Sequence, residues 1–152
     1  MQTWTRPPFL VSTDKAILNI ELIHGFLRTT YWSPDIPRDF VERAIEHSLC
    51  FGLFHETEQI GFARIISDRS SFAYLADVFV LDAWRGRGLS KFLMECIKSH
   101  PELQNLRRWL LATADAHGLY EQFGFKPIAK PERLMEVVEP KVYQRILQER
   151  VP

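Results

Sequence analysis

Two arginines and two glycines alternate in the segment Arg85-Gly-Arg-Gly88-Leu-Ser90, and these residue types can hold a phosphate. Glycine lets the backbone approach a ligand closely and adopt dihedral angles that other residues avoid. Arginine adds fixed positive charge and planar donors that match phosphate oxygens. A helix that begins near Leu89 would point its free N–H groups and the positive end of its dipole at this loop. The segment therefore predicts an anion site at the head of a helix.

The same segment also fits a loop that binds nothing, with glycines that only make a tight turn and arginines that are only solvated. The dinucleotide fingerprint GxGxxG is absent, because Lys91 occupies its last glycine position. The phosphate-loop pattern GxxxxGK[ST] is absent too. From these residues alone, an occupied and an idle loop both stay open.

Length and composition limit the class of protein. The 152 residues fit a single domain, 1–152, that is large enough to bury a core. Nineteen basic residues balance nineteen acidic ones, which argues against a general nucleic-acid binder. Cys50 and Cys96 form neither a CxxC motif nor a metal-ligand spacing. We find no signal peptide or membrane-spanning stretch in the sequence and therefore expect a reduced, cytoplasmic protein without a membrane partner.

The order of predicted elements places the glycine loop between a strand and a helix. A short strand and two helices come first, the second helix opening at Pro37. A hairpin and a third strand follow, and then the loop with its helix. Beyond it we expect alternating strands and helices and a weaker final strand pair. The expected strands are Phe9–Ser12, Leu49–His55, Gln59–Ser67, Phe72–Leu81, Trp109–Thr113, Phe125–Ile128, Met135–Val138 and Val142–Ile146; the expected helices begin at Thr13 or Asp14, at Pro37, at Leu89 (to Ser99) and at Asp115 (to Phe123). This order predicts an α+β domain on one central mixed sheet flanked by helices.

Two segments at a characteristic spacing resemble a known family. The loop Arg85–Ser90 resembles the [Q/R]-x-x-G-x-[G/A] loop of the GNAT superfamily of acetyl-CoA-dependent N-acetyltransferases, and Val78 and Val80 before it resemble the family's V-x-V strand. About thirty residues later, Leu119-Tyr120-Glu-Gln-Phe123-Gly-Phe125 is similar to the family's LYxxxGF segment. The resemblance implies a three-layer α/β arrangement with a mostly antiparallel sheet, in which one parallel strand pair splays to form an acyl-CoA cleft.

The resemblance also implies which residues hold acetyl-CoA as co-substrate. The pantetheine arm would lie between the strand Val78–Val80 and its parallel neighbour Trp109–Thr113. The pyrophosphate would bind loop N–H groups. The implied coenzyme contacts are Val78, Phe79, Val80, Arg85, Gly86, Arg87, Gly88, Leu89 and Ser90. Ser90 and Thr113 depart from the family pattern, which usually has Gly or Ala and often Asn at these positions.

Two residues are candidates for catalysis. The resemblance implies that Tyr120 donates a proton to the departing thiolate. Asp77 begins the key strand, and if Val78 and Val80 share a face it would point with Leu75 and Phe79 to the opposite face. A carboxylate between apolar neighbours can act as general base. The alternatives are an ion pair with Arg64 and a water chain in place of a dedicated base.

The acceptor side is the least defined part of the sequence. The N-terminal helices carry residues that would line an acceptor pocket, namely His24, Phe26, Arg28, Tyr31 and Trp32. No histidine shows a metal-ligand spacing, so we expect no metal. The sequence therefore predicts an N-acetyltransferase acting on a primary amine of a small molecule or peptide by direct attack, as a monomer or homodimer. The alternative is a non-catalytic acyl-CoA-binding or sensing domain.

Overall fold

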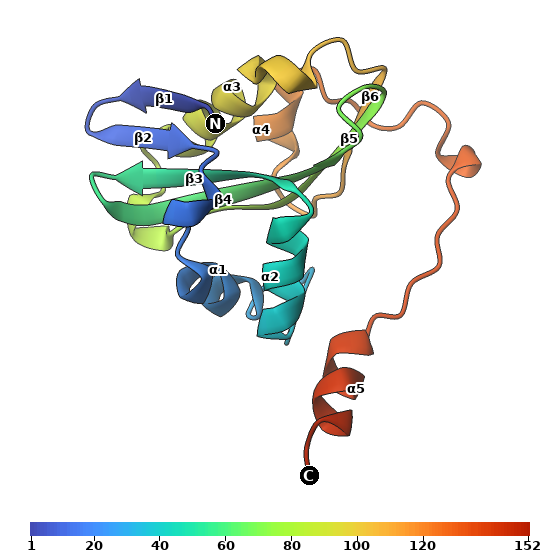
Figure 1. Ribbon diagram of the computed structural model, residues 1–152. Coiled ribbons are helices and arrows are strands. Elements are labelled where there is room, and N and C mark those ends of the chain that lie inside the picture. The colour runs from blue at the N-terminus through green and yellow to red at the C-terminus, as the bar shows by residue number, and fades with distance from the viewer.

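The computed structural model describes residues 1–152, which form a six-stranded sheet with helices on both faces (Figure 1). The strands follow one another across the sheet in chain order. Only the last pair, β5 with β6, is parallel. The strands are β1 (Thr3–Arg6), β2 (Phe9–Ser12), β3 (Leu49–His55), β4 (Glu58–Ser67), β5 (Phe72–Val80) and β6 (Arg108–Leu111); the helices are α1 (Ile20–Leu27), α2 (Arg38–Glu46), α3 (Leu89–Ser99), α4 (His117–Glu121) and α5 (Val142–Glu149). The mixed, mostly antiparallel sheet flanked by helices is confirmed.

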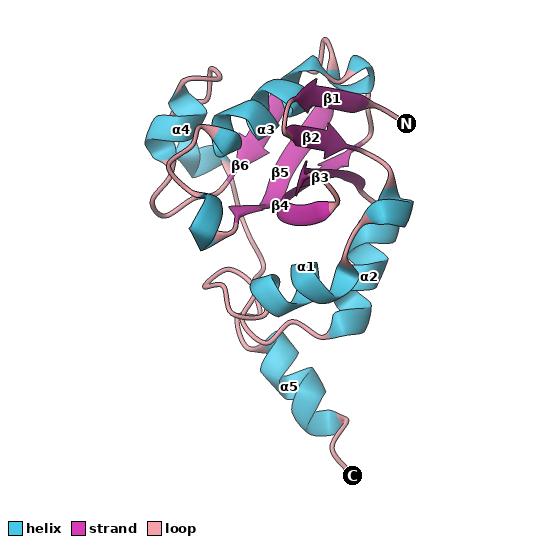
Figure 2. Ribbon diagram, turned by 90° about the vertical axis from the view of Figure 1, so that its left-hand side faces the viewer, coloured by secondary structure: helices cyan, strands magenta, loops and turns pink.

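Helices α3 and α4 cover one face of the sheet, and α1 and α2 cover the other (Figure 2). The first face buries a cluster of seventeen residues, six of them from α3. The apolar positions of α3 recur every three to four residues, so one side of this helix packs on the sheet. The second face buries nine residues around Phe62 and Phe79. Helix α3 has the bounds that the sequence predicts.

A β-bulge in β5 changes which side chains share a face. The β4–β5 register shifts between Phe62 and Arg64, so β5 carries one extra residue there. Asp77 takes a positive φ of 55° at this point. Leu75, Val78 and Val80 consequently all pack toward α3. The expectation that Asp77 shares a face with Leu75 is wrong, because the bulge breaks the strand's alternation. Phe79 does pack on the α1–α2 face, the face on which Asp77 lines a cavity.

Strands β5 and β6 separate partway along their length. Their pairing ends at Leu75 and Leu111, while β5 continues to Val80. The remainder of β5 therefore has no strand beside it on this edge. The splayed parallel pair that the family resemblance implies is confirmed, and it opens a gap at the head of α3.

Several predicted elements at the ends of the chain are wrong or misplaced. Strand β1 was not expected. Asp14 does cap a helical segment by accepting from the Ala16 N–H, but that segment is a single 3-10 turn, Lys15–Ile17, and α1 begins only after Asn19, whose side chain accepts from the Leu22 N–H. Segment 125–128 is not a strand, and neither is 135–138; segment 142–149 is helix α5. Strand-forming residues in the C-terminal segments have no neighbouring strand here, so their preference is not expressed. None of the helices combines the length and apolar composition needed to span a bilayer.

Candidate active site

The glycine loop between β5 and α3 is open toward solvent. Gly86 and Gly88 both have left-handed backbones, with φ of 77° and 73°. A Cβ on either residue would meet no atom within 4 Å. The conformation and the empty space together explain why glycine occupies both positions. The loop thus leaves room for a ligand directly against its backbone.

The loop also presents unused hydrogen-bond donors. Gly88 caps α3 without a side chain, and no group of the protein accepts from the backbone N–H groups of residues 86–91. These donors lie at the positive end of the α3 dipole. A helix start with free N–H groups and a glycine cap binds an anion well. The predicted anion site has the geometry that it requires.

The two loop arginines differ in what they contact. The Arg85 side chain donates to the Val80 carbonyl oxygen at 3.1 Å and pairs with Asp82 at 3.1 Å. Arg85 therefore fixes the loop to the end of β5. The Arg87 guanidinium lies 4.8 Å from the centre of the Trp84 ring and has no carboxylate partner. Arg87 is consequently free to meet a phosphate.

A cavity of about 210 Å³ occupies the gap between β5 and β6. We call it the donor cleft. Its walls come from both strands, from the start of α3, from α4 and from the loop after α1. Among the lining residues are Phe26, Val78, Phe79, Val80, Arg85, Ser90, Leu111 and Tyr120. The structure thus brings most of the predicted coenzyme contacts to one cleft, with Gly86, Arg87, Gly88 and Leu89 in the adjoining loop.

Tyr120 is 8% exposed and lines the donor cleft from α4. Burial raises the pKa of its phenol to about 12, with Tyr31 and Asp115 adding to the shift. Its ring packs edge-on against Phe125, with centroids 5.9 Å apart. The hydroxyl has no hydrogen-bond partner in the protein, yet it is not among the enclosed, unsatisfied polar atoms. Tyr120 therefore presents a protonated phenol to the cleft.

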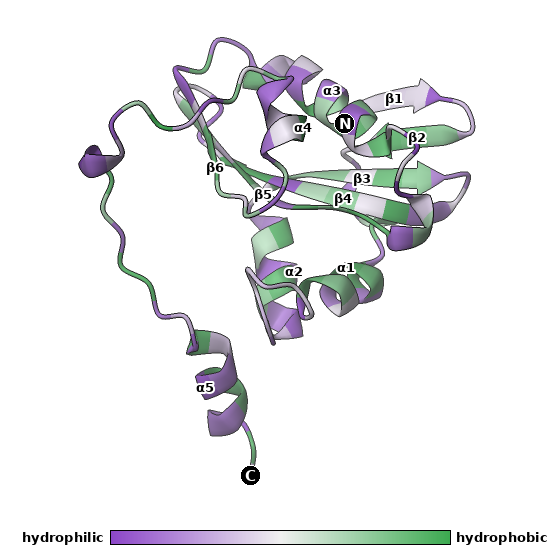
Figure 3. Ribbon diagram, turned by 180° about the vertical axis from the view of Figure 1, so that it is seen from behind, coloured by the Kyte–Doolittle hydropathy of each residue, from purple (hydrophilic) through white to green (hydrophobic).

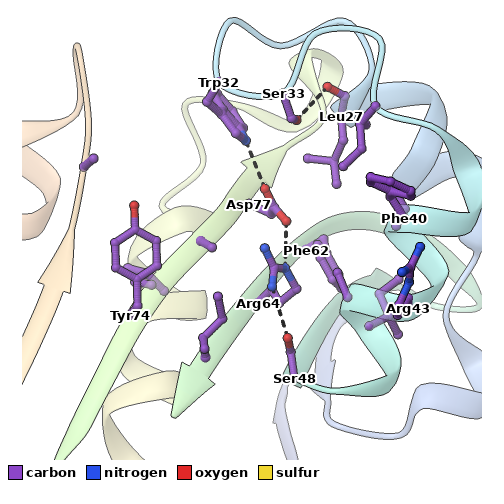
Figure 4. Close-up of a pocket in the computed structure, with 18 of the residues that line it drawn as sticks. Leu27, Trp32, Ser33, Phe40, Arg43, Ser48, Phe62, Arg64, Tyr74 and Asp77 are labelled. Atoms are coloured by element: carbon purple, nitrogen blue, oxygen red, sulfur yellow. Dashed lines mark hydrogen bonds and ion pairs between the residues drawn. The ribbon is translucent and has the colours of Figure 1, made fainter. Parts of the chain in front are cut away.

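Asp77 makes two contacts with side chains on other elements (Figure 4). One carboxylate oxygen accepts from Arg64 Nε at 2.8 Å, and the other accepts from the Trp32 indole N–H at 3.0 Å. Arg64 also donates to the Ser48 hydroxyl at 3.1 Å. The ion pair is well shielded, since the two side chains are 16% and 11% exposed. The apolar surroundings expected for Asp77 are wrong, and the alternative of an Arg64 ion pair is what the structure contains.

A second and larger cavity of about 820 Å³ lies beside this ion pair, on the α1–α2 face of the sheet. We call it the acceptor cavity. Figure 4 shows Arg64 and Asp77 from the sheet and Phe40 and Arg43 from α2. Most of its lining is apolar or aromatic. Asp77 is its only carboxylate, and that group is already paired.

The five residues expected to bind the acceptor fall into two groups. Tyr31 and Trp32 line both the acceptor cavity and the donor cleft, and Phe26 lines the donor cleft. His24 lines neither, because its ring bonds the Ile36 carbonyl oxygen at 2.9 Å and holds the loop after α1. Arg28 also lines neither; it follows the last residue of α1 and is exposed. The expectation of a pocket role for His24 and Arg28 is therefore not supported.

The loop between α1 and α2 connects the two cavities. The Ala114 N–H donates to the Tyr31 hydroxyl at 3.0 Å, and Trp32 reaches Asp77. Leu75, Ala112 and Thr113 complete a shared wall. The loop thus spans the gap between β5 and the segment after β6, and a ligand in one cavity would meet a ligand in the other at this wall.

Sequence reasoning missed much of the acceptor lining. The additional residues include Phe40, Arg43, Ser48, Ile66, Tyr74 and Tyr143. They come from α2, β4, β5, α5 and the turn before β3. No local motif links residues so widely spaced in sequence. Only the ion pair between Arg64 and Asp77 was visible, because the two residues were expected on neighbouring strands.

Comparison with known proteins agrees with this geometry. Residues 18–125 match the acetyltransferase (GNAT) family. A crystal structure of a candidate acetyltransferase of that family from Xanthomonas campestris pv. campestris is 54% identical, with a TM-score of 0.88 over 91% of this chain and 99% of that one. A candidate acetyltransferase from Gibberella zeae is 34% identical, covering 78% of this chain and 79% of its own. The chain belongs to the GNAT family of acetyltransferases.

Members of this family use acyl-CoA as the group donor. A protein named AAC(6')-Iy, solved in complex with the bisubstrate analogue CoA-S-monomethyl-acetylneamine, has the same fold, with a TM-score of 0.60 over 86% of this chain and 97% of that one. At 21% identity, this likeness concerns the fold alone. The protein is thus an acyltransferase of class EC 2.3.1, and its acceptor has to be argued from the site.

Proposed function

We propose that this protein transfers an acetyl group from acetyl-CoA to a primary amine of a small molecule or peptide by direct attack within a ternary complex. The observation that carries the proposal is the continuity of the anion-binding loop, the donor cleft and the acceptor cavity. Tyr120 lines the donor cleft and Asp77 lines the acceptor cavity, on the two sides of the wall that the cavities share. We further propose that residues 1–152 act as one domain, because the acceptor cavity takes its lining from the loop after α1 through to α5.

The loop residues suit the diphosphate of the coenzyme. Unpaired N–H groups from Arg87 to Ser90 would donate to its oxygens, and the Arg87 guanidinium would add charge. The Ser90 hydroxyl lies at the cleft and can donate as well. The pantetheine would follow the free edge of β5 from Val78 to Val80, with Phe79 contributing backbone groups.

Transfer then requires a short sequence of bond changes. The neutral amine nitrogen attacks the thioester carbonyl carbon, the C–S bond breaks, and the sulfur leaves as thiolate. A backbone N–H of Val78–Val80 would stabilise the oxyanion. Tyr120 would protonate the thiolate, because burial raises the pKa of its phenol to about 12 and so keeps the proton on the phenol until the thiolate departs. The amine proton would pass to water in the open acceptor cavity.

We assign Asp77 a positioning role in this reaction. Its carboxylate holds the Trp32 indole at the wall shared by the two cavities while neutralising Arg64. The other interpretation is that Asp77 acts as the general base. Its carboxylate would then have to take a proton from the amine while it still accepts hydrogen bonds from Arg64 and Trp32. These two contacts therefore support a role in positioning Trp32.

The acceptor cavity supports an apolar amine. Trp32, Phe40 and Tyr143 provide aromatic surface, and Arg43 provides positive charge at the rim. A polycationic acceptor would find no free carboxylate there, since Asp77 is paired. We therefore propose a primary amine carried on an apolar or aromatic body.

The experiment is an acceptor screen with acetyl-CoA that follows release of the free thiol. The panel contains an arylalkylamine, an apolar dipeptide amide and a linear polyamine. We expect the first two to be acetylated at least tenfold faster, as kcat/KM, than the polyamine. Preference for the polyamine would contradict the acceptor class. Acetyl-CoA binding without thiol release on a broad panel would contradict catalysis and favour a sensing domain.

A further inference from the structure

The acceptor cavity is lined by more basic than acidic side chains. Its basic residues are Arg43, Arg64 and His47, and its only carboxylate is Asp77. Asp77 pairs with Arg64 at 2.8 Å, so these two charges offset each other. His47 has Glu46 within 3.9 Å, and Glu46 does not line the cavity. Arg43 is therefore the arginine whose charge the cavity itself does not balance.

The carboxylate beside Arg43 is already occupied by another arginine. One oxygen of Asp39 accepts from Arg150 Nη1 at 2.8 Å, and the other accepts from Arg150 Nη2 at 3.1 Å. The distance from Asp39 to Arg43 Nη2 is 3.6 Å, which is too long for a hydrogen bond. The hydrogen bond from Arg150 is also the main reason why the pKa of Asp39 lies below its usual value, and Arg43 has the smallest effect on it. The guanidinium of Arg43 consequently has N–H donors to offer.

Helix α5 brings this second arginine to Asp39. The helix lies beyond α2, on the side away from the sheet, and carries hydrophilic residues along much of its length (Figure 3). Arg150 directly follows its last residue. Tyr143, from the same helix, lines the acceptor cavity and packs edge-on against Phe40. Docking of α5 thus engages Asp39 and leaves Arg43 to the cavity.

The Arg43 side chain lies against an aromatic ring of the cavity (Figure 4). Its guanidinium carbon is 4.8 Å from the centre of the Phe40 ring. Stacking on a ring orients a guanidinium and leaves the N–H donors along its edge free. The Arg43 side chain is 60% exposed, so a ligand can reach it. An acceptor would therefore meet aromatic surface and a planar positive group side by side.

The chemistry and the place of Arg43 indicate which anionic group it can bind. A guanidinium matches a carboxylate in a bidentate pair. A phosphate group carries about −1.5 to −2 charges at neutral pH, more than one arginine offsets. Arg43 lines only the acceptor cavity, whereas Tyr31, Trp32 and Thr113 form the wall shared with the donor cleft. A carboxylate on Arg43 and a reacting amine at that wall would lie at different ends of the acceptor.

We propose, building on the function proposed above, that the acceptor is a short peptide with apolar or aromatic side chains. Its free C-terminal carboxylate pairs with Arg43, and its N-terminal amine reaches the wall shared with the donor cleft. A cavity of about 820 Å³ has room for such a ligand. Arg150 is a positioning residue, because its pair with Asp39 leaves Arg43 free for the peptide.

Paired acceptors test the role of Arg43. Apolar dipeptides and tripeptides are offered with acetyl-CoA, each as the free acid and as the C-terminal amide, and thiol release is followed. We expect the wild-type protein to favour the acid about tenfold in kcat/KM, as a hydrogen bond to a charged group implies. Arg43→Met should abolish this preference. Arg28→Met is the matched control and should keep it, since Arg28 is exposed and lines neither cavity. Equal rates for acid and amide in the wild type, or a preference that survives Arg43→Met, would overturn the proposal.

Binding of the reaction products tests Arg43 without turnover. Calorimetry at saturating free CoA compares an N-acetylated tripeptide acid with its amide. We expect the acid to bind the wild-type protein about tenfold more tightly, and Arg43→Met to bind both equally. Equal binding by the wild type would overturn the pairing even where acetyl transfer occurs. Absence of thiol release with every amine would contradict the proposed function instead, and the binding comparison would still decide the role of Arg43.

Arg150→Met tests the positioning role of Arg150. Asp39 then loses both hydrogen bonds and can pair with Arg43, so the preference for the acid should fall about threefold, a small effect because the pair is exposed. An α5 that only supports the cavity would slow acid and amide equally, and that result would contradict the positioning role. The Arg43 and Arg150 side chains are 60% and 50% exposed, so both variants should fold, and thermal unfolding checks this.

Discussion

The donor cleft and the acceptor cavity meet at one wall, but they are built in different ways. The donor side consists mainly of backbone groups from one continuous segment, Val78–Ser90, with Tyr120 added from α4. The acceptor side consists of side chains from α2, β4, β5, α5 and the loop after α1. The first binds through free N–H groups and conformation, and the second through shape and apolar surface.

This difference implies different responses to substitution. A site built from backbone depends on the few residues that set its dihedral angles, so one added methyl group can disrupt it. A site built from scattered side chains changes gradually, because each residue contributes a small part of the surface. Asp77 holds Trp32 at the wall between the donor cleft and the acceptor cavity. Substitutions of these two residues should therefore change how the two bound substrates are placed relative to each other.

The largest effect is expected at Tyr120. Tyr120→Phe removes the hydroxyl but keeps the ring in its buried packing, so kcat should fall about 100-fold, the lower end for loss of a general acid. KM for acetyl-CoA and the melting temperature should hardly change. Burial keeps the pKa near 12, so the phenol should stay protonated up to about pH 11 and any decline of the wild-type rate below that pH should have another cause. Steady-state kinetics of the wild-type protein and of Tyr120→Phe from pH 6 to 10 checks the fall in kcat and the pH dependence. An unchanged kcat for Tyr120→Phe would contradict the role of Tyr120 as general acid.

The next largest effect concerns stability, at the wall between the cavities. Asp77→Asn leaves the Arg64 guanidinium shielded from water without a counter-charge, and breaking such a pair costs about 3 kcal/mol of the free energy of unfolding. Urea unfolding measures this loss. If Asp77 only positions its neighbours, kcat/KM near neutral pH should fall less than tenfold. A loss of about 100-fold at unchanged stability would instead identify Asp77 as the general base.

The donor side is tested by adding one methyl group to the glycine loop and measuring the affinity for acetyl-CoA. Gly88→Ala places a Cβ at a left-handed position, which costs about 1–2 kcal/mol, and the methyl group enters space beside the loop N–H groups. The empty loop can relax and avoid this strain, but the loop that holds acetyl-CoA cannot. The strain therefore weakens binding, and the Kd for acetyl-CoA should rise about tenfold. Gly25→Ala is the matched control, since Gly25 lies in α1 with open space around it. Titration calorimetry compares them; equal affinities would contradict a backbone-built donor site.

The smallest effect is expected from one side chain of the acceptor cavity. Phe40→Leu removes an aromatic surface that packs edge-on against Tyr143, with centroids 5.8 Å apart. Such contacts are worth about 0.5–1.5 kcal/mol, so KM for an arylalkylamine should rise about threefold. KM for acetyl-CoA should stay the same. If both KM values rise together, the two sites are not separable as described.

The sequence alone was sufficient for the donor side because its determinants are local. Glycine at positions 86 and 88 and the helix from Leu89 to Ser99 can be identified from short-range patterns, and the family resemblance of residues 119–125 adds Tyr120. The bulge at Asp77 could not, because an extra residue in one strand shows only in the register with its neighbour. That single residue moved Leu75 to the other face, whereas the ion pair of Asp77 with Arg64 was expected as one of the alternatives.

The acceptor side and the C-terminus were less predictable because they depend on long-range contacts. Helical position alone does not show that His24 bonds the Ile36 carbonyl while Tyr31 reaches Ala114. The segment between α4 and α5 illustrates the same limit. Residues 135–138 have the preferences of a strand, but a strand exists only where a second strand pairs with it. Tertiary contacts, within or between chains, decide such segments.

Backbone hydrogen exchange with and without acetyl-CoA tests the central claim most directly, because it reports on each part of the backbone separately. The account predicts that acetyl-CoA slows exchange of the amides from Gly86 to Lys91, which have no acceptor in the protein, and of β5 beyond Leu75. Helix α2, on the acceptor side, should be unaffected until an amine is added. Protection confined to α2, or none at all at saturating acetyl-CoA, would contradict a donor site formed by the loop and the splayed strands.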